Sequence, residues 1–405
     1  MNRVRLLTAL TMVAAVLFST LPATAAVNVQ CPGDTNGDAV IDTPDPNHPN
    51  AVCMHLGAGD GYIKMADGRP MYMFGFSNLT GVPAANVMDV GTLDAAFPAP
   101  TIAVDEGDEL YLNLTNVGMV MRPDLFDPHS VHFHGFPQAS TVFDGVPESA
   151  VSIKMGATLP YYYAIVEPGT YMYHCHVEAA EHMQMGMLGN LYVRPAQNGT
   201  AFTYNGRTYT TFAYNDGDGS TGYDREYPIQ IGSFDSQFHD SSEGVQPLPF
   251  AFMRDDYPML NGRGYPDTVD PGTLTPPAEN GSKPSQLVSS LITASAGERV
   301  LLRISNLNVT RFYTLATLGL PMEVVGRDAK LLRGPDPDGA GPLVGKTFYY
   351  TTSSVTLGGG ESVDVILDTA GTTAGDVYLL YTTNLNYLNN KTEEFGGMMT
   401  EIRIN

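Results

Sequence analysis

Six of the nine histidines in this chain lie between positions 129 and 182, where they surround a single cysteine. In order, the set is His129, His132, His134, His174, Cys175, His176 and His182, followed by Met187. Imidazole, thiolate and thioether groups are ligands for soft and borderline transition metals. The spacing therefore predicts a metal centre.

One subset of these side chains has the composition of a blue copper site. Such a site combines two histidines, one cysteine and a weakly bound axial methionine. The matching residues are His129, Cys175, His182 and Met187, with Met185 as a competing axial ligand. A structural zinc site is the main alternative, but its closed tetrahedral ligand set leaves the other histidines without a role.

The other histidines form two His-x-His pairs, His132 with His134 and His174 with His176. Side chains alternate between the two faces of a β-strand, so the members of each pair point the same way. Cys175, between the second pair, then points to the opposite face. The strand is predicted to send its thiolate to one copper and its imidazoles to a second metal site nearby.

The segments HSVHFHG (129–135) and YHCH (173–176) resemble the copper motifs of multicopper oxidases of the laccase type. The resemblance implies type 1 copper on the blue-copper set above, type 2 copper on His132, and type 3 copper on His134, His174 and His176. It also implies that Asp144 lies beside the type 2 copper and assists proton delivery to oxygen. The alternative is that Asp144 only builds a turn with Gly145.

The resemblance covers most of the chain. The segments PTI (100–102), DGVP (144–147) and PGTY (168–171) resemble a first domain of the family, and AGER (296–299) and GESVDV (360–365) resemble its copper-free domain. We therefore expect an all-β chain of two cupredoxin-like Greek-key β-sandwiches, a copper-bearing domain at 59–195 and a copper-free domain at 196–405. Short strand-like runs with little helical periodicity also favour an all-β fold.

The resemblance implies an oxidoreductase that takes electrons from a small-molecule or metal-ion reductant and reduces dioxygen to water. A complete three-copper centre in the family takes histidines from two facing domains, and this sequence offers only one half of that set. Two copies of domain 1 facing each other across a twofold axis would complete it, so we expect a homo-oligomer. A copper nitrite reductase-like trimer and a type 1 electron-transfer protein without oxidase activity are the alternatives.

Three histidines stand outside the cluster. His48, His55 and His239 are expected to be ordinary surface or loop residues. His239, the only histidine after position 195, could approach a copper of a neighbouring subunit.

The first 25 residues have the pattern of a secretory signal peptide. Arg3 and Arg5 precede an apolar stretch (6–21) and the small residues Ala-Thr-Ala (23–25). We expect export to the periplasm or beyond, and no later run is apolar enough to span a membrane. The formal net charge of -22 argues against nucleic acid as a partner, since binding to phosphates needs clustered Lys and Arg.

Residues 26–58 form an acidic segment in front of the predicted domains. Cys31 and Cys53 are expected to form a disulfide in an oxidising compartment. Between them, oxygen ligands at EF-hand-like spacing predict a possible calcium loop, namely Asp34, Asn36, Asp38, Val40, Asp42 and Asp45. Ala39 at the usual glycine position and the lack of flanking helical patterns favour the alternative, a solvated turn.

Overall fold

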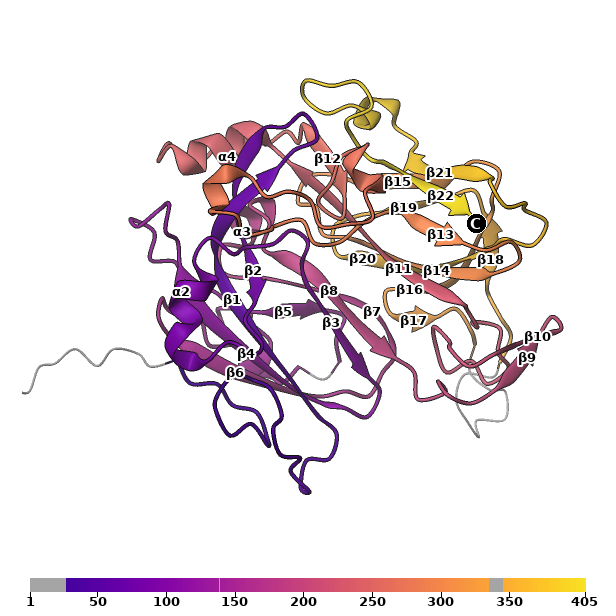
Figure 1. The fold of residues 1–405 in the computed structure, drawn as a ribbon, viewed down its shortest axis with the longest axis horizontal. Helices are drawn as coiled ribbons and strands as arrows, with labels where there is room; N and C mark the ends of the chain where they lie inside the picture. The colour runs from indigo at the N-terminus through magenta and orange to yellow at the C-terminus, as the bar shows by residue number, and fades with distance from the viewer. Residues whose placement is uncertain (1–26, 138, 335–344) are drawn as a thin grey trace, which may run out of the picture.

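The computed structural model describes residues 27–137, 139–334 and 345–405, and the predicted signal peptide lies outside these ranges. The expected all-β fold is confirmed: strands build two sandwiches (Figure 1), and the α-helices in these ranges are short. They are α2 (Val87–Gly91), α3 (Ala179–Gln184) and α4 (Ser236–Glu243). In these ranges, no helix has the length and apolar character needed to cross a membrane.

The first sandwich packs a sheet of order β2-β1-β4-β6 against one of order β3-β8-β7-β5. β1 begins before position 59, inside the stretch assigned to the acidic segment. The strands are β1 (Ala51–Lys64), β2 (Pro70–Asn78), β3 (Ala99–Asp105), β4 (Glu109–Gly118), β5 (His132–His134), β6 (Thr158–Ala164), β7 (Gly169–His174) and β8 (Leu188–Arg194).

The second sandwich follows the small hairpin of β9 (Phe202–Tyr204) and β10 (Arg207–Tyr209). Its sheets have the orders β12-β11-β14-β20-β16-β17, with β18 paired to β16, and β13-β22-β21-β15-β19. The strands are β11 (Arg225–Phe234), β12 (Tyr257–Leu260), β13 (Ile292–Ala294), β14 (Arg299–Asn306), β15 (Tyr313–Thr317), β16 (Met322–Arg327), β17 (Lys330–Leu331), β18 (Tyr350–Thr352), β19 (Ser354–Leu357), β20 (Glu361–Asp368), β21 (Val377–Thr382) and β22 (Met399–Ile404).

Short 3-10 helices lie in the connections between strands. Their bounds are η1 (Ala84–Asn86), η2 (Thr141–Phe143), η3 (Phe250–Phe252), η4 (Asp267–Val269), η5 (Ala278–Asn280) and η6 (Leu385–Leu388).

A buried polar network joins the two sandwiches at β7, the strand that leads to Cys175. Thr170 on β7 donates from Oγ1 to Asp364 Oδ1 on β20 at 2.6 Å, and its carbonyl accepts a bond from Ser362 Oγ at 2.8 Å. The fully buried Arg303 of β14 donates to Thr170 Oγ1 at 3.1 Å. These buried hydrogen bonds cross from one sandwich to the other, and such bonds are strong in a low-dielectric interior, so they hold β7 against the second sandwich.

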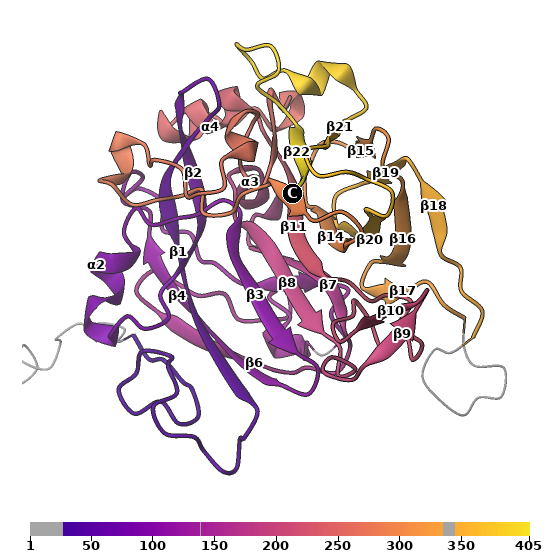
Figure 2. The ribbon, with the colours of Figure 1, turned by 45° about the vertical axis from the view of Figure 1, so that its right-hand side comes forward.

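Helix α4 makes a second junction between the sandwiches. Figures 1 and 2 show α4, from the second half of the chain, beside one end of β2. Tyr62 of β1 donates from its hydroxyl to Glu243 Oε1 at 2.7 Å, and Arg69 forms an ion pair with Asp240. These contacts place the helix against the first sandwich.

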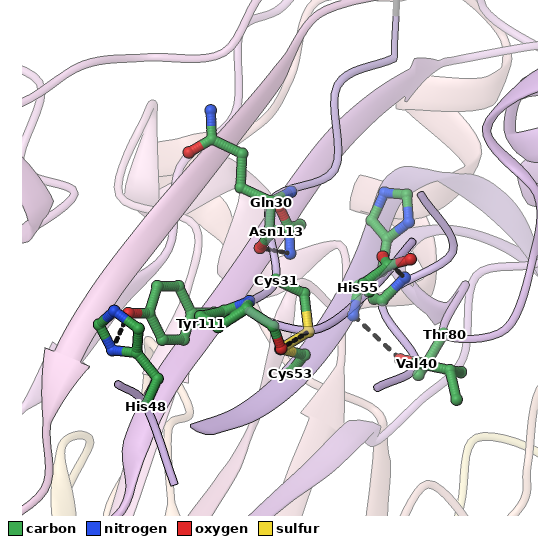
Figure 3. Close-up of a disulfide and its surroundings, with 12 residues drawn as sticks. Gln30, Cys31, Val40, His48, Cys53, His55, Thr80, Tyr111 and Asn113 are labelled. Atoms are coloured by element: carbon green, nitrogen blue, oxygen red, sulfur yellow. Dashed lines mark hydrogen bonds between the residues drawn. A yellow bond between two sulfur atoms is a disulfide. The ribbon is translucent and has the colours of Figure 1, made fainter. Parts of the chain in front are cut away.

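The acidic N-terminal segment is held on the first sandwich. A disulfide joins Cys31 to Cys53 of β1, with a Cα–Cα distance of 5.8 Å (Figure 3). The Asp34 carboxylate accepts bonds from the backbone amides of Gly37 and Ala39, so the predicted calcium loop is closed by its own backbone. The disulfide and these turns hold the segment against the first sandwich.

His55 differs from its sequence-based expectation. It lies on β1, is fully buried, and has its Nε2 2.7 Å from Thr115 Oγ1 of β4. The prediction of a surface residue is therefore wrong for His55. His48 is only partly buried, beside Glu109.

Candidate metal centre

The first cluster is a buried group of one sulfur and two ring nitrogens. Cys175 Sγ lies 3.7 Å from His129 Nδ1 and 3.2 Å from His182 Nδ1, and all three residues are fully buried. Metal–nitrogen and metal–sulfur bonds of about 2.0 and 2.3 Å place two ligands of one ion roughly 3 to 4 Å apart. These three atoms therefore fit a single metal ion.

Several segments position this group. His129 exchanges backbone hydrogen bonds with Ile153, and Cys175 follows the end of β7. His182 lies on α3, after which the chain folds back so that the Met187 carbonyl accepts a bond from the Cys175 amide at 3.1 Å. Met185 and Met187 are both fully buried in the same core as Cys175. The choice of axial methionine stays a prediction.

The charges within this group favour the thiolate form of Cys175. Burial alone would raise the pKa of the thiol, but His182 and His129 lower that pKa well below its ordinary value. Burial lowers the pKa of His182, but the sulfur and Asp127 outweigh burial and raise that pKa to about 10, so without a metal the imidazole is paired with the thiolate as a cation. Because the thiolate is the form of cysteine that binds metals, the site is prepared for a soft or borderline ion.

The second cluster is built where β5 pairs with the end of β7. In this antiparallel pair, His132 lies opposite His174, while Phe133 between the two β5 histidines is buried in the core. His134 Nε2 lies 2.8 Å from His174 Nε2. The two strands thus bring three imidazoles together, as the alternation of side chains along a strand predicts.

His176 joins the cluster from just beyond the strand. The sequence predicts a strand through position 176, but β7 ends at His174. The backbone beyond His174 still brings the His176 ring to the same cluster. Its centroid lies 5.6 Å from that of the His174 ring and 5.0 Å from that of the His132 ring. All four predicted imidazoles are therefore neighbours, whereas the Cys175 side chain lies in the other cluster.

Backbone carbonyl groups orient two of these rings. His132 Nδ1 donates to the Asp144 carbonyl at 2.6 Å, and His174 Nδ1 donates to the Cys175 carbonyl at 2.7 Å. A hydrogen bond at Nδ1 fixes the tautomer and leaves Nε2 for a metal. The Asp144 carboxylate is also close, with Oδ1 3.5 Å from His132 Nδ1.

The turn that carries Asp144 needs glycine at the next position. Gly145 has φ +76°, and a Cβ atom there would lie 2.1 Å from the Val131 carbonyl oxygen. The glycine therefore lets the turn lie directly against the chain entering β5. Sequence reasoning considered only the carboxylate of Asp144 and missed the role of its main-chain carbonyl.

Burial favours the neutral form of two imidazoles in the second cluster, His134 and His174. Burial lowers the pKa of His174 to about 3, with a further contribution from His134. Burial and the neighbouring His132 also lower the pKa of His134. Since imidazole must be unprotonated to bind a metal, these groups need no pH adjustment to become ligands near neutrality.

A cavity of about 570 Å³ opens on His134, His174 and His176. Its opposite wall comes from the second sandwich, at residues 308–312 and 359–360. Gly360, with φ +91°, comes so close that an added Cβ would lie 2.8 Å from His134 Nδ1. No histidine lies on the described part of this wall, so within this chain the cavity separates the four imidazoles from a surface without further ligands.

His239 does not point toward a neighbouring subunit. It is fully buried inside its own chain, between the backbone carbonyls of Tyr72 and Gln184. The expectation that it approaches another subunit's copper is therefore not met. Nothing in the sequence around His239 indicates this location.

Residues 78–198 match the family model described as multicopper oxidase. The matched segment contains every predicted copper ligand from His129 to Met187 and the candidate proton-delivering residue Asp144.

Curated proteins similar to this chain include multicopper oxidases and laccases. The chain is 32% identical to multicopper oxidase MCE of Talaromyces pinophilus over 120 residues, which are 29% of this chain and 18% of that protein. It is 24% identical to laccase-1 of Cryptococcus neoformans over 322 residues, covering 77% of this chain and 43% of the laccase. The chain thus spans less than half the length of these relatives, which support an oxidoreductase.

Solved structures share the cupredoxin-like fold. The blue copper oxidase of Nitrosomonas europaea superposes with a TM-score of 0.60 and 22% identity, covering 87% of this chain and 85% of that one. The copper nitrite reductase of the same organism gives a TM-score of 0.55 and 18% identity, covering 87% and 94%. The predicted resemblance to the multicopper oxidase family is confirmed.

Proposed function

We propose that this protein is a copper-dependent oxidoreductase of the multicopper oxidase, laccase-like type. It oxidises a small-molecule or metal-ion reductant at a type 1 copper and reduces dioxygen to water at a three-copper cluster. The observation that carries the proposal is the position of Cys175: its sulfur belongs to one cluster while the adjacent His174 ring belongs to the other. The two sites are then joined by the shortest covalent route that a protein chain offers.

The ligands are assigned to three copper types. Type 1 copper would be held by His129, Cys175, His182 and Met187, type 2 by His132, and type 3 by His134, His174 and His176. When bound, copper supplies one-electron redox chemistry at the type 1 site and dioxygen reduction at the cluster.

The protein groups around these ligands have separate tasks. The Asp127 carboxylate lies 3.8 Å from His182 Nε2, where it stabilises the ring orientation. Asp144 holds His132 through its carbonyl, and its carboxylate, partly exposed, can carry a proton between solvent and the cluster. Proton supply is needed because reduction of dioxygen to water consumes protons.

We further propose that the cluster forms between two chains. The copper-bearing domain (59–195) supplies half of the imidazoles that a three-copper centre of this family takes, and the copper-free domain (196–405) supplies none at the cavity wall. Two copies of the copper-bearing domain facing each other across a twofold axis would complete the set. Such isologous contacts are the commonest interfaces of homo-oligomers.

A nitrite reductase-like enzyme is the second candidate, supported by the structural likeness to nitrite reductases. Such an enzyme needs type 1 and type 2 sites only, which leaves the second histidine of each pair without a metal. The test compares oxygen uptake with a phenolic or ferrous reductant against nitrite consumption without oxygen. Oxygen uptake by copper-loaded protein supports the oxidase. Nitrite consumption without oxygen uptake would instead support the nitrite reductase. A protein that has a type 1 copper spectrum but shows neither activity would be an electron carrier.

Two minor proposals complete the assignment. The disulfide and the predicted signal peptide support export of the chain.

Calcium binding at 34–45 is supported by Ala39, whose φ of 65° is the left-handed conformation for which calcium loops use glycine. Titration calorimetry of the copper-loaded protein with calcium tests that second point, and absence of heat would exclude it.

A further inference from the structure

His239 is a buried histidine that the copper chemistry does not use. It lies on α4, with Nδ1 2.6 Å from the Tyr72 carbonyl oxygen and Nε2 3.0 Å from the Gln184 carbonyl oxygen. The Phe234 ring packs against it with 4.4 Å between centroids. The ring is therefore fixed in place, with each nitrogen directed at a backbone acceptor of the first sandwich.

The two carbonyl groups belong to the segments that position the type 1 ligands. Gln184 is the last residue of α3, which carries His182, and it directly precedes Met185. A carbonyl at a helix C-terminus lacks a partner within the helix, so a donor from outside stabilises it. His239 Nε2 lies at hydrogen-bond distance from this carbonyl, at the point where the chain turns from His182 toward the axial methionine.

Tyr72 belongs to the second segment, β2. Two residues further on, the amide of Phe74 donates to the Met185 carbonyl at 2.9 Å. The Phe74 ring also packs edge-on against the His182 ring, with 5.8 Å between centroids. His239 thus contacts both β2 and the end of α3, the two segments that pack around His182.

We propose that His239 is a positioning residue for the type 1 copper. From the copper-free sandwich it holds the segment 182–187, which comprises the end of α3 and the turn after it, and so sets the placement of His182 and the axial methionine. This inference rests on the proposed function, because it requires a type 1 copper at Cys175. Helix α4 reaches this position through its own contacts with the first sandwich, the Arg69–Asp240 ion pair and the Tyr62–Glu243 hydrogen bond (Figures 1 and 2).

The test uses two substitutions and a matched control in the copper-loaded full chain. His239→Phe keeps a ring but removes both ring nitrogens and with them the contacts to Tyr72 and Gln184, whereas His239→Gln keeps a donor for one carbonyl. His55→Phe removes another fully buried imidazole, one that contacts Thr115 on β4 instead of the ligand loop. The readouts are the thiolate-to-copper absorption band, the reduction potential of the type 1 copper, its affinity by chelator competition, and thermal unfolding.

We expect His239→Phe to shift the band and the potential and to lower copper affinity by about 10-fold at most. This is the lower end of the loss caused by removing a direct hydrogen-bond partner of a metal ligand, because His239 acts through the backbone. His239→Gln should show smaller shifts and carries the test if His239→Phe does not fold. His55→Phe should lose stability without changing the band. Wild-type spectrum, potential and affinity in both His239 variants, with only a loss of stability, would overturn the inference. A wild-type protein without a thiolate band after copper loading would instead overturn the proposed function.

Discussion

The His132 ring is oriented by the main chain of Asp144, whose carbonyl oxygen lies 2.6 Å from His132 Nδ1, while the carboxylate of the same residue is 3.5 Å away. One residue thus has two separable relationships to the second cluster. The carbonyl fixes the ring, and only the carboxylate can exchange a proton. A substitution of the Asp144 side chain should therefore impair proton transfer and leave the orientation of His132 unchanged.

Asp144→Asn is expected to keep the copper content of the protein and to lower its oxygen-reduction rate by about 100-fold, the typical contribution of a general acid. The measurement is oxygen uptake with a saturating reductant, beside copper analysis of the same sample. Loss of copper in Asp144→Asn would mean that the carboxylate, not the carbonyl, holds His132. Unchanged oxygen uptake would show that Asp144 only forms a turn and does not deliver protons.

Gly360 belongs to the copper-free sandwich, and Gly360→Ala should displace His134 of the second cluster. Both Gly360 (φ +91°) and Gly371 (φ +85°) have left-handed backbones, but an added Cβ meets His134 Nδ1 at 2.8 Å only at Gly360, whereas Gly371 has nothing within 4 Å. Each alanine costs about 1 kcal/mol of backbone strain. We expect both variants to lose that stability in denaturant titrations.

Copper analysis then separates the two glycine variants. Gly360→Ala should lose copper from the cluster while its type 1 band stays, because the added methyl group displaces His134. Gly371→Ala should keep all of its copper. Equal copper content in the two variants would show that the 359–360 turn does not press on His134 in solution.

The buried His55 predicts an acid-dependent loss of stability. Burial lowers its pKa in the folded protein to about 4, against 6.5 when exposed, so the unfolded chain takes up the proton first. The stabilisation is complete above pH 6.5 and is lost as the pH falls toward 4. Between pH 7 and 4.5 the free energy of unfolding should fall by about 2 kcal/mol through this residue.

His55→Phe removes this titration. Urea unfolding of the wild-type protein and the variant at both pH values measures it, and the difference in stability between the two proteins should shrink at the lower pH. A difference that is the same at pH 7 and pH 4.5 would contradict the assignment of a neutral buried imidazole.

The sequence was sufficient for those features that depend on local periodicity. Alternation along a strand correctly places His174 and His176 on one side and the Cys175 side chain on the other, because this geometry belongs to the extended backbone itself. The opposition of His132 and His174 follows from the antiparallel pairing of two such strands. The exact strand end at His174 did not follow, since strand ends depend on the neighbouring chain.

Contacts made by long-range packing could not be predicted. Gly360 lies close to His134 although more than half of the chain separates the two positions in sequence. The residue type at position 360 does not indicate which residue it contacts. The hydrogen bond from His132 to the Asp144 carbonyl could not be predicted either, because every residue has a backbone carbonyl group. His239 and His55 were expected in accessible positions on the assumption that an isolated histidine lies outside the core, and burial by the tertiary fold overrides such an assumption.

The central claim is that the chain holds a type 1 copper and shares a three-copper cluster with a second copy. The most direct measurement is the copper content of the fully loaded protein together with its mass in solution. We expect a dimer, or an assembly of dimers, with about five copper ions per pair of chains, two of type 1 and about three in the cluster. A trimer or monomer with a single copper ion in each chain would contradict the account.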